Sequence, residues 1–247
     1  MVIHSFSSGV ELPDEPSRVR ATRRKGVMVE AVKQKGGASE KRRRILDGAL
    51  KAFAKKGFYN TKVSEIAAEA GVADGTIYLY FKNKDDLLIS LFEDRMEWIN
   101  ERLRVELDNM SGGFREKLSA LIRGHFMLVV EHRDLAEFIT VELRQSAKFV
   151  KEYSNPKFGD YLKILQRLLE QAQQSGELRE DFDARLMSRA IFGALDEVLL
   201  QLSLTAKVEV EEVERRTRML SAMFLSGLEP ASGGLSGRAR AGGGEAE

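Results

Sequence analysis

Two short helical patterns, separated by a turn that contains one glycine, constrain the fold of this chain more than any other feature. The first pattern covers residues 61–70, where Thr61 can cap the helix and Gly71 suits a left-handed C-cap. Its apolar residues recur at spacings of three and four, as one face of an α-helix requires: Val63, Ile66, Ala67 and Ala70. The sequence therefore predicts a short helix that stops at a tight turn.

A second short helix is predicted over residues 74–81, with Ile77 and Phe81 toward the core and Thr76 and Tyr80 on an adjoining face. A helix, a glycine turn and a short second helix form a helix-turn-helix, whose second helix enters the DNA major groove. A motif match is a hypothesis, so a second interpretation stays open. In that interpretation the two helices are only a packed hairpin, and the tyrosines are ordinary surface residues.

Two residues near this turn suit phosphate binding. Gly75 has no side chain, so the backbone N–H groups at the helix start can approach an anion that the helix dipole favours. Lys84, at the start of the next helix, supplies a positive charge for another phosphate.

A third helix is predicted upstream, over residues 39–56, with Ser39 as its N-cap and Gly57 as its stop. Its apolar face consists of Ile45, Leu46, Ala49, Leu50, Phe53 and Ala54. Three short helices of this kind make a compact domain.

The motifs F-A-x-x-G-F, I-A-x-x-A-G-V, G-T-I-Y-x-Y-F and K-x-x-L-L follow one another between residues 53 and 88. At this spacing the segment resembles the DNA-binding domain of the TetR family of one-component bacterial repressors. The resemblance implies DNA contacts from Lys62, Ser64, Ala73, Gly75, Thr76, Tyr78, Tyr80 and Lys84. Asp74 is a departure: it caps the second helix, accepts a hydrogen bond from a cytosine amine, or repels the wrong sequence.

Composition narrows the class of protein. Residues 1–90 carry 17 Lys and Arg against 11 Asp and Glu, whereas residues 91–247 carry 22 against 27. Basic charge thus gathers around the predicted DNA-binding segment, which suits phosphate binding, although a charge difference of this size also arises in proteins that bind no nucleic acid. The chain has no cysteine, no apolar run long enough to span a bilayer, and three histidines without zinc-site spacing. We expect a cytoplasmic protein that is not an enzyme and has no metal site or cofactor.

The predicted organisation is all-α. Residues 1–38 are predicted to be a flexible basic arm, residues 39–83 the helix-turn-helix domain, residues 84–227 a helical ligand-binding and dimerisation domain, and residues 228–247 a disordered glycine-rich tail. The arm's basic cluster either reaches the minor groove or is a solvated tail: Arg18, Arg20, Arg23, Arg24 and Lys25. Translation can start at Met1 or at Met28. Further helices are predicted over residues 84–110, 114–131, 134–146, 155–175, 183–204 and 210–227.

The last two predicted helices are more apolar than one core requires. Their apolar residues are Leu186, Ala190, Phe192, Gly193, Leu195, Leu199, Leu200 and Leu202, and then Val213, Met219, Leu220, Met223, Phe224 and Leu225. Pairing of two such hairpins would form a homodimer through residues 183–204 and 210–227 and place two DNA-reading helices on one face. Such a dimer would bind a pseudo-palindromic operator with half-sites roughly 34 Å apart. The alternative is simple burial within one monomer.

The second domain has an apolar set that forms either a core or a pocket for an elongated ligand. These residues are Leu121, Phe126, Val129, Phe138, Val141, Leu162, Leu165, Leu169 and Phe192. Polar residues are expected near the pocket's mouth for an anionic head group: Arg123, His125, Arg144 and Gln145.

Four further segments resemble the TetR-type repressors of fatty-acid degradation genes: H-F at 125–126, V-E-L-R-Q-S at 141–146, Q-S-G-E-L at 174–178 and I-F-G-A-L-D-E at 191–197. That resemblance implies a repressor that long-chain acyl-CoA releases from its operator by shifting the helix over residues 84–110. A second hypothesis is a TetR-type repressor of an efflux system that senses hydrophobic compounds. A third is a helical lipid-binding carrier without DNA function.

Overall fold

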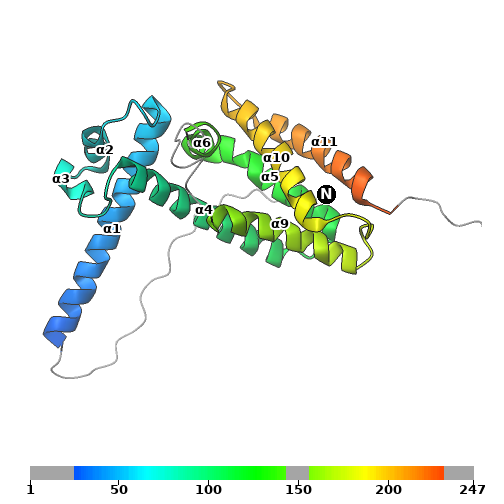
Figure 1. Cartoon of the computed structure of the whole chain (residues 1–247), viewed down its shortest axis with the longest axis horizontal. Helices are drawn as coiled ribbons and strands as arrows, with labels where there is room; N and C mark the ends of the chain where they lie inside the picture. Colours follow the sequence, from blue (N-terminus) through cyan, green and yellow to red (C-terminus); the bar gives the residue numbers. More distant parts are fainter. Residues whose placement is uncertain (1–24, 143–155, 231–247) are drawn as a thin grey trace, which may run out of the picture. The chain divides into compact units, whose positions relative to one another are not determined.

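The computed structural model describes the backbone of residues 25–142 and 156–230 and the side chains of residues 38–141 and 156–230. This part of the chain is helical and contains no strand, which confirms the predicted all-α class (Figure 1). None of its helices is long and apolar enough to cross a membrane. Residues from Arg42 onward form one compact unit, and the packing below lies within it.

The first helix, α1, is longer than predicted. It covers Lys25–Lys56, so it begins at Lys25 and not at Ser39 as the N-cap pattern suggested. The segment V-E-A-V-K-Q-K contains good helix formers, and each of the glycines that follow costs a helix only about 1 kcal/mol. The C-terminus of α1 is as predicted: Gly57 has a φ of 79° and donates its N–H to the Phe53 carbonyl at 2.8 Å. Residues 1–24, with most of the predicted basic cluster, lie outside the described residues.

The other helices agree with their predicted bounds within a few residues, with two exceptions. The second helix of the predicted helix-turn-helix, described below, is one of them. The predicted helix over 134–146 is instead a short α6 that continues as a π-helical turn, η1, and residues 143–155 lie outside the described part. Three consecutive β-branched residues, Ile139 to Val141, disfavour regular α-helix, and the Thr140 hydroxyl donates to the Ala136 carbonyl at 2.7 Å. The bounds are α2 Val63–Ala70, α3 Asp74–Ile77, α4 Lys84–Asn109, α5 Phe114–Glu131, α6 Arg133–Glu137, η1 Phe138–Glu142, α9 Pro156–Gln174, α10 Ala184–Ser203 and α11 Val210–Leu228.

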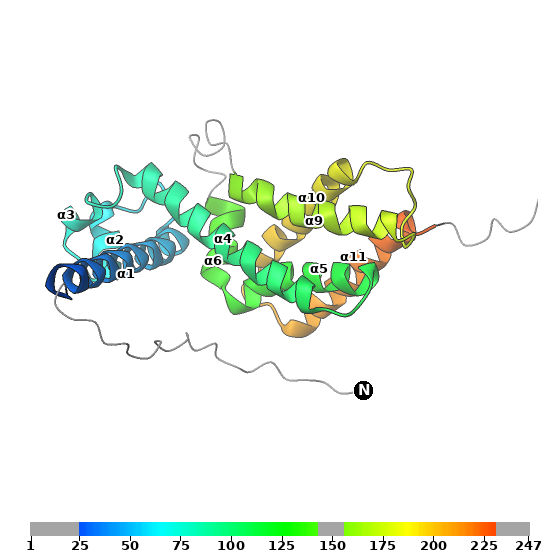
Figure 2. The ribbon, with the colours of Figure 1, turned by 90° about the horizontal axis from the view of Figure 1, so that it is seen from below.

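α5 is the central helix of the second domain, since it packs against α4, α6, α9, α10 and α11. Figures 1 and 2 show α4 extending from the neighbourhood of α2 and α3 to the group formed by α5, α9, α10 and α11. Its buried side chains occur along its whole length: Leu88 and Leu91 lie in the N-terminal half and Leu103 and Leu107 in the C-terminal half. α4 is thus one rigid element shared by both domains.

Two direct contacts also join the domains. The rings of Phe53 in α1 and Phe138 at the start of η1 stack with centroids 6.4 Å apart. Arg95 of α4 forms an ion pair with Asp47 of α1. The π-helical turn therefore lies against the core of the three-helix domain.

Candidate functional site

The turn between α2 and α3 is held by glycine geometry and by an arginine of α1. Gly71 has a φ of 62°, and the N–H groups of Gly71 and Val72 donate to carbonyls in the last turn of α2. The Arg44 guanidinium in α1 donates to the Ala70 carbonyl at 2.7 Å and to the Gly71 carbonyl at 2.7 Å. A Cβ at Gly71 would lie 2.9 Å from Arg44 Nη2, so both the backbone angle and the available space favour glycine. Arg44 was missed from sequence, where it looks like one of several surface charges.

The start of α2 differs from the prediction that Thr61 caps it. Thr61 is buried, and its hydroxyl is shared between the carbonyls of Ala52 at 3.1 Å and Gly57 at 2.7 Å. α2 begins at Val63, and Glu65 accepts a hydrogen bond from the backbone N–H of Lys62 at 2.9 Å. Thr61 therefore fixes the loop to α1, while a side chain inside α2 satisfies the donor at its start.

The second helix of the motif is shorter than predicted. α3 ends at Ile77, and tighter turns follow, in which Tyr80 and Phe81 both donate to the Ile77 carbonyl at 3.0 Å. Ile77 and Phe81 are buried, as predicted. Tyr78 and Leu79 face outward with 57% and 81% of their surface exposed. The tight turns project these two side chains away from the core.

The predicted DNA-contacting residues of this motif lie on α2, α3 and the turns around them. Lys62, Ser64, Ala73, Gly75 and Tyr78 are exposed, whereas Thr76 and Tyr80 are half-buried. A Cβ added at Gly75 would meet no atom within 4 Å, so packing within the protein does not require a glycine there. Leu79 was not predicted, although its place between two tyrosines already marked it as a candidate for apolar contact with a base.

Lys84 has a different environment from the one predicted. Its ammonium donates to the carbonyls of Phe58 at 2.8 Å, Thr61 at 3.1 Å and Tyr59 at 3.3 Å, and it lies 4.6 Å from the centroid of the Phe58 ring. These carbonyls take up the three donors that a lysine has. Lys84 therefore fastens the α1–α2 loop to the first turn of α4, and its contact with a phosphate stays a prediction.

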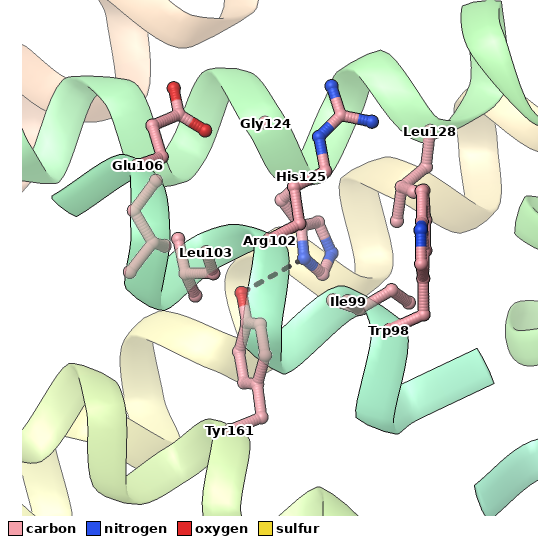
Figure 3. A pocket seen from close by; sticks show the side chains of 10 residues that line it. Trp98, Ile99, Arg102, Leu103, Glu106, Gly124, His125, Leu128 and Tyr161 are labelled. Carbon is pink, nitrogen blue, oxygen red and sulfur yellow. Dashed lines mark hydrogen bonds between the residues drawn. The ribbon is translucent and has the colours of Figure 1, made fainter. Parts of the chain in front are cut away.

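A small pocket of about 40 Å³ lies between α4, α5 and α9 (Figure 3). Its lining is mainly apolar and includes one buried histidine. The lining residues are Trp98, Ile99, Arg102, Leu103 and Glu106 of α4, Leu121, Gly124, His125 and Leu128 of α5, and Tyr161 of α9. Among the described residues, no group of His, Asp and Glu side chains could hold a metal ion.

His125 lies inside this region and not at a charged mouth as predicted. Only 8% of its surface is exposed, and its Nδ1 lies 3.1 Å from the Tyr161 hydroxyl. Burial lowers the pKa of His125 to about 4. The imidazole is therefore neutral near pH 7 and offers no charge to an anionic group.

The other predicted ligand residues are dispersed. Phe126 and Leu165 are fully buried, and Phe138 is the residue stacked on Phe53. Phe192 packs edge-on against His125, with centroids 6.1 Å apart, so these two are brought together. Arg123 is not at the pocket, because it forms an ion pair with Glu214 of α11 at 2.6 Å. Arg144 and Gln145 lie outside the described residues. Trp98 and Tyr161 were missed, although a lone phenol on an apolar helix face is a usable signal.

The outer faces of α10 and α11 carry exposed apolar side chains. Leu186 is 68% exposed and Met219 is 61% exposed, whereas Leu195, Leu199 and Leu225 are buried within the monomer. Burial in one monomer thus accounts for only part of the apolar content of these helices.

Comparison with known proteins matches two family models to successive parts of the chain. The model "Bacterial regulatory proteins, tetR family" matches residues 45–91, and "YsiA-like protein, C-terminal region" matches residues 92–216. The chain is 43% identical over 155 residues to the fatty acid metabolism regulator protein of Bacillus subtilis, which covers 63% of this chain and 79% of that protein.

Two solved structures are similar over most of the fold. The transcriptional regulator FadR from Bacillus subtilis, in complex with stearoyl-CoA, superposes with a TM-score of 0.69 and 37% identity, covering 74% of this chain and 97% of that chain. The fatty acid degradation regulator FadR from Bacillus halodurans gives a TM-score of 0.68 and 34% identity, covering 75% and 98%. With two family models spanning residues 45–216, the chain belongs to the tetR family of bacterial regulatory proteins.

Proposed function

We propose that this protein is a homodimeric transcriptional repressor of fatty-acid degradation genes, and that long-chain acyl-CoA releases it from its operator. The observation that carries the proposal is the similarity to fatty-acid regulators, one of them with stearoyl-CoA bound, over both the DNA-binding and the helical domain. The geometry of the pocket, of α4 and of the α2–α3 surface supports each step.

DNA binding is assigned to the exposed surface of α2 and α3. Tyr78 and Leu79 project from the short second helix, and Leu79 is suited to apolar contact with a thymine methyl group. The exposed start of α2 and the open backbone at Gly75 are suited to phosphate oxygens.

Dimerisation is assigned to α10 and α11. Exposed apolar side chains on a helix pair are buried most simply by the same pair of a second copy, which forms a four-helix bundle. Two copies so arranged present two α2–α3 surfaces to successive major grooves, roughly 34 Å apart.

Ligand binding must enlarge the pocket. Ligand pockets are typically about 300–1,000 Å³, whereas the pocket between α4, α5 and α9 measures about 40 Å³. An acyl chain can therefore enter only if these helices separate. Because one wall is α4, the separation moves the helix whose first turn holds the α1–α2 loop through Lys84.

Operator and ligand then bind with opposite preference. The empty pocket requires one position of α4 and the filled pocket requires another. Only one of these two positions gives the two α2–α3 surfaces of the dimer the spacing that operator binding needs. Reciprocal coupling of this kind is typically worth about 1–3 kcal/mol.

The test is a fluorescence-anisotropy titration of the purified protein on a pseudo-palindrome from its own promoter region. Palmitoyl-CoA is expected to release the DNA, and free CoA is not. Release by neutral or cationic hydrophobic compounds, with no response to palmitoyl-CoA, would instead support an efflux regulator. Absence of salt-dependent DNA binding would support the lipid carrier, since phosphate neutralisation gives a steep salt dependence.

A further inference from the structure

One buried polar atom beside the pocket lacks a partner. Nε2 of His125 is inaccessible to solvent and has no hydrogen bond among the described residues. An unsatisfied buried polar group destabilises the folded state, so such a group calls for an explanation.

Hydrogen-bond accounting selects the tautomer of His125. Its one recorded hydrogen bond joins Nδ1 to the Tyr161 hydroxyl at 3.1 Å. If Nδ1 were the donor, both the phenol hydrogen and the Nε2 lone pair would be left without a recorded partner in the described part of the chain. If the phenol donates to Nδ1, the proton is on Nε2 and only that N–H is unsatisfied. Burial raises the pKa of the Tyr161 phenol, so it keeps its proton as a donor.

The surroundings select the kind of acceptor. The imidazole lies among the rings of Phe126, Tyr161 and Phe192, with centroid distances of about 6 Å, and it borders a mainly apolar pocket. Figure 3 shows the hydrogen bond to Tyr161, with Leu103 of α4 on one side of the ring and Ile99 of α4 on the other. A neutral N–H in an apolar site suits an uncharged acceptor such as a carbonyl oxygen, and it does not repay the desolvation of a phosphate.

We propose that the Nε2–H of His125 donates a hydrogen bond to the carbonyl oxygen of an acyl thioester ligand, and that Tyr161 is the positioning residue that holds the proton on Nε2. This inference rests on the proposed acyl-CoA response and identifies the group that reads the ligand. The thioester carbonyl is the one uncharged acceptor at the junction of acyl chain and CoA. The pair therefore distinguishes acyl chains from alkyl chains of the same length.

The ligand side of this bond can be changed alone. Palmitoyl-CoA is compared with the thioether hexadecyl-CoA, in which a methylene replaces the carbonyl, in the operator-release assay. The protein should require about tenfold more thioether for half-release, because one net hydrogen bond separates the two ligands. For each variant we take the ratio of the half-release concentration of hexadecyl-CoA to that of palmitoyl-CoA. Comparing this ratio between variants cancels differences in operator affinity.

Three variants locate the donor. His125→Phe should bring the ratio to about one, and Tyr161→Phe should lower it by freeing the other tautomer. His125→Gln keeps an N–H near the Nε2 position and should restore part of the ratio. Melting curves of each variant report whether it folds. A tenfold ratio that persists in folded His125→Phe overturns the proposal.

A spectroscopic measurement on the unmodified sequence covers the case of a variant that does not fold. The chain has three histidines, so a ¹⁵N spectrum of histidine-labelled protein is simple. The Nε2–H tautomer of His125 should be present, and its resonance should shift with palmitoyl-CoA but not with hexadecyl-CoA. Release by both ligands at equal concentration overturns the inference alone. No release by palmitoyl-CoA overturns the proposed function and the inference together.

Discussion

The proposed DNA-reading surface of α2 and α3 and the proposed ligand pocket are built in opposite ways. The predicted contacts on α2 and α3 fall within residues 62–80, and their supporting residues, Ile77 and Phe81, lie within this segment or directly after it. The pocket takes its walls from α4, α5 and α9, between Trp98 and Tyr161. The first region is exposed, whereas the second is a pocket of only about 40 Å³. A preformed surface can bind at once, but a pocket this small must move helices to bind an acyl chain, and this difference is what the proposed ligand-controlled switch requires.

The largest expected effect concerns the joint between the two regions. Phe53→Ala removes a fully buried ring that contacts Phe58 on one side and Phe138 on the other. We expect a loss of about 3–5 kcal/mol in the free energy of unfolding, measured by urea denaturation. The helical circular-dichroism signal and the Trp98 fluorescence should change in one common transition, because Trp98 lies on the shared helix α4. Separate transitions would show that the two regions are independent.

The pocket should make stability depend on pH. The pKa of His125 is lowered from about 6.5 to about 4 by burial, so the folded state binds its proton more weakly than the unfolded state. Its contribution is complete above pH 6.5 and is lost as pH falls toward 4, by about 3 kcal/mol in total. At each pH, the unfolding free energy of His125→Phe is subtracted from that of the unmodified protein, and the difference isolates the contribution of His125. A difference that is flat between pH 6.5 and 4 would mean that the imidazole is not buried in solution.

Lys84 lies at the start of the helix α4 that joins the two regions. Its structural role at the α1–α2 loop and the predicted phosphate contact can be tested separately. Lys84→Met keeps most of the side chain and removes the ammonium from three carbonyls. We expect a loss of about 1.5–3 kcal/mol in stability, as for hydrogen bonds to a charged group. The salt dependence of operator binding should stay unchanged. A direct phosphate contact would instead lower that slope by about 0.9. Lys82→Met, at an exposed lysine on the same segment, is the matched control.

Substitution of exposed residues on the proposed DNA-reading surface should weaken operator binding and leave ligand binding unchanged. Tyr78→Ala and Leu79→Ala remove outward side chains that the core does not use. Each should weaken operator binding by about 1–3 kcal/mol, as loss of a base contact does, while palmitoyl-CoA binding measured by calorimetry is unchanged. Equal loss of both activities would indicate damage to the fold.

The smallest effect separates two glycines of the same motif. Gly75→Ala has free space for its Cβ and an ordinary helical backbone, so its unfolding free energy should stay the same or rise by about 0.4–1 kcal/mol. Operator affinity should fall nonetheless if a phosphate lies close to that backbone. Gly71→Ala is the comparison, because a φ of 62° costs an L residue about 1–2 kcal/mol. Equal stability of the two variants would contradict the assigned geometry of the turn.

The sequence by itself determined what depends on neighbouring residues. Helical spacing and a left-handed glycine are local properties, so the α2–α3 turn, the buried Ile77 and Phe81 and the bounds of α5 were predictable. Where local signals conflicted, as in the β-branched run from Ile139 to Val141, the predicted α-helix becomes a π-helical turn, which the spacing of apolar residues did not predict.

Only the tertiary structure decided which distant groups meet. Lys84 is paired with carbonyls more than twenty residues away, and His125 is neutral because α9 brings Tyr161 to it and the surrounding rings exclude water. Hydrogen bonding and desolvation depend on position in space, and a linear pattern of residues does not contain that position. The family could therefore be recognised from the chain, whereas the environments of the individual polar groups came from the packed helices.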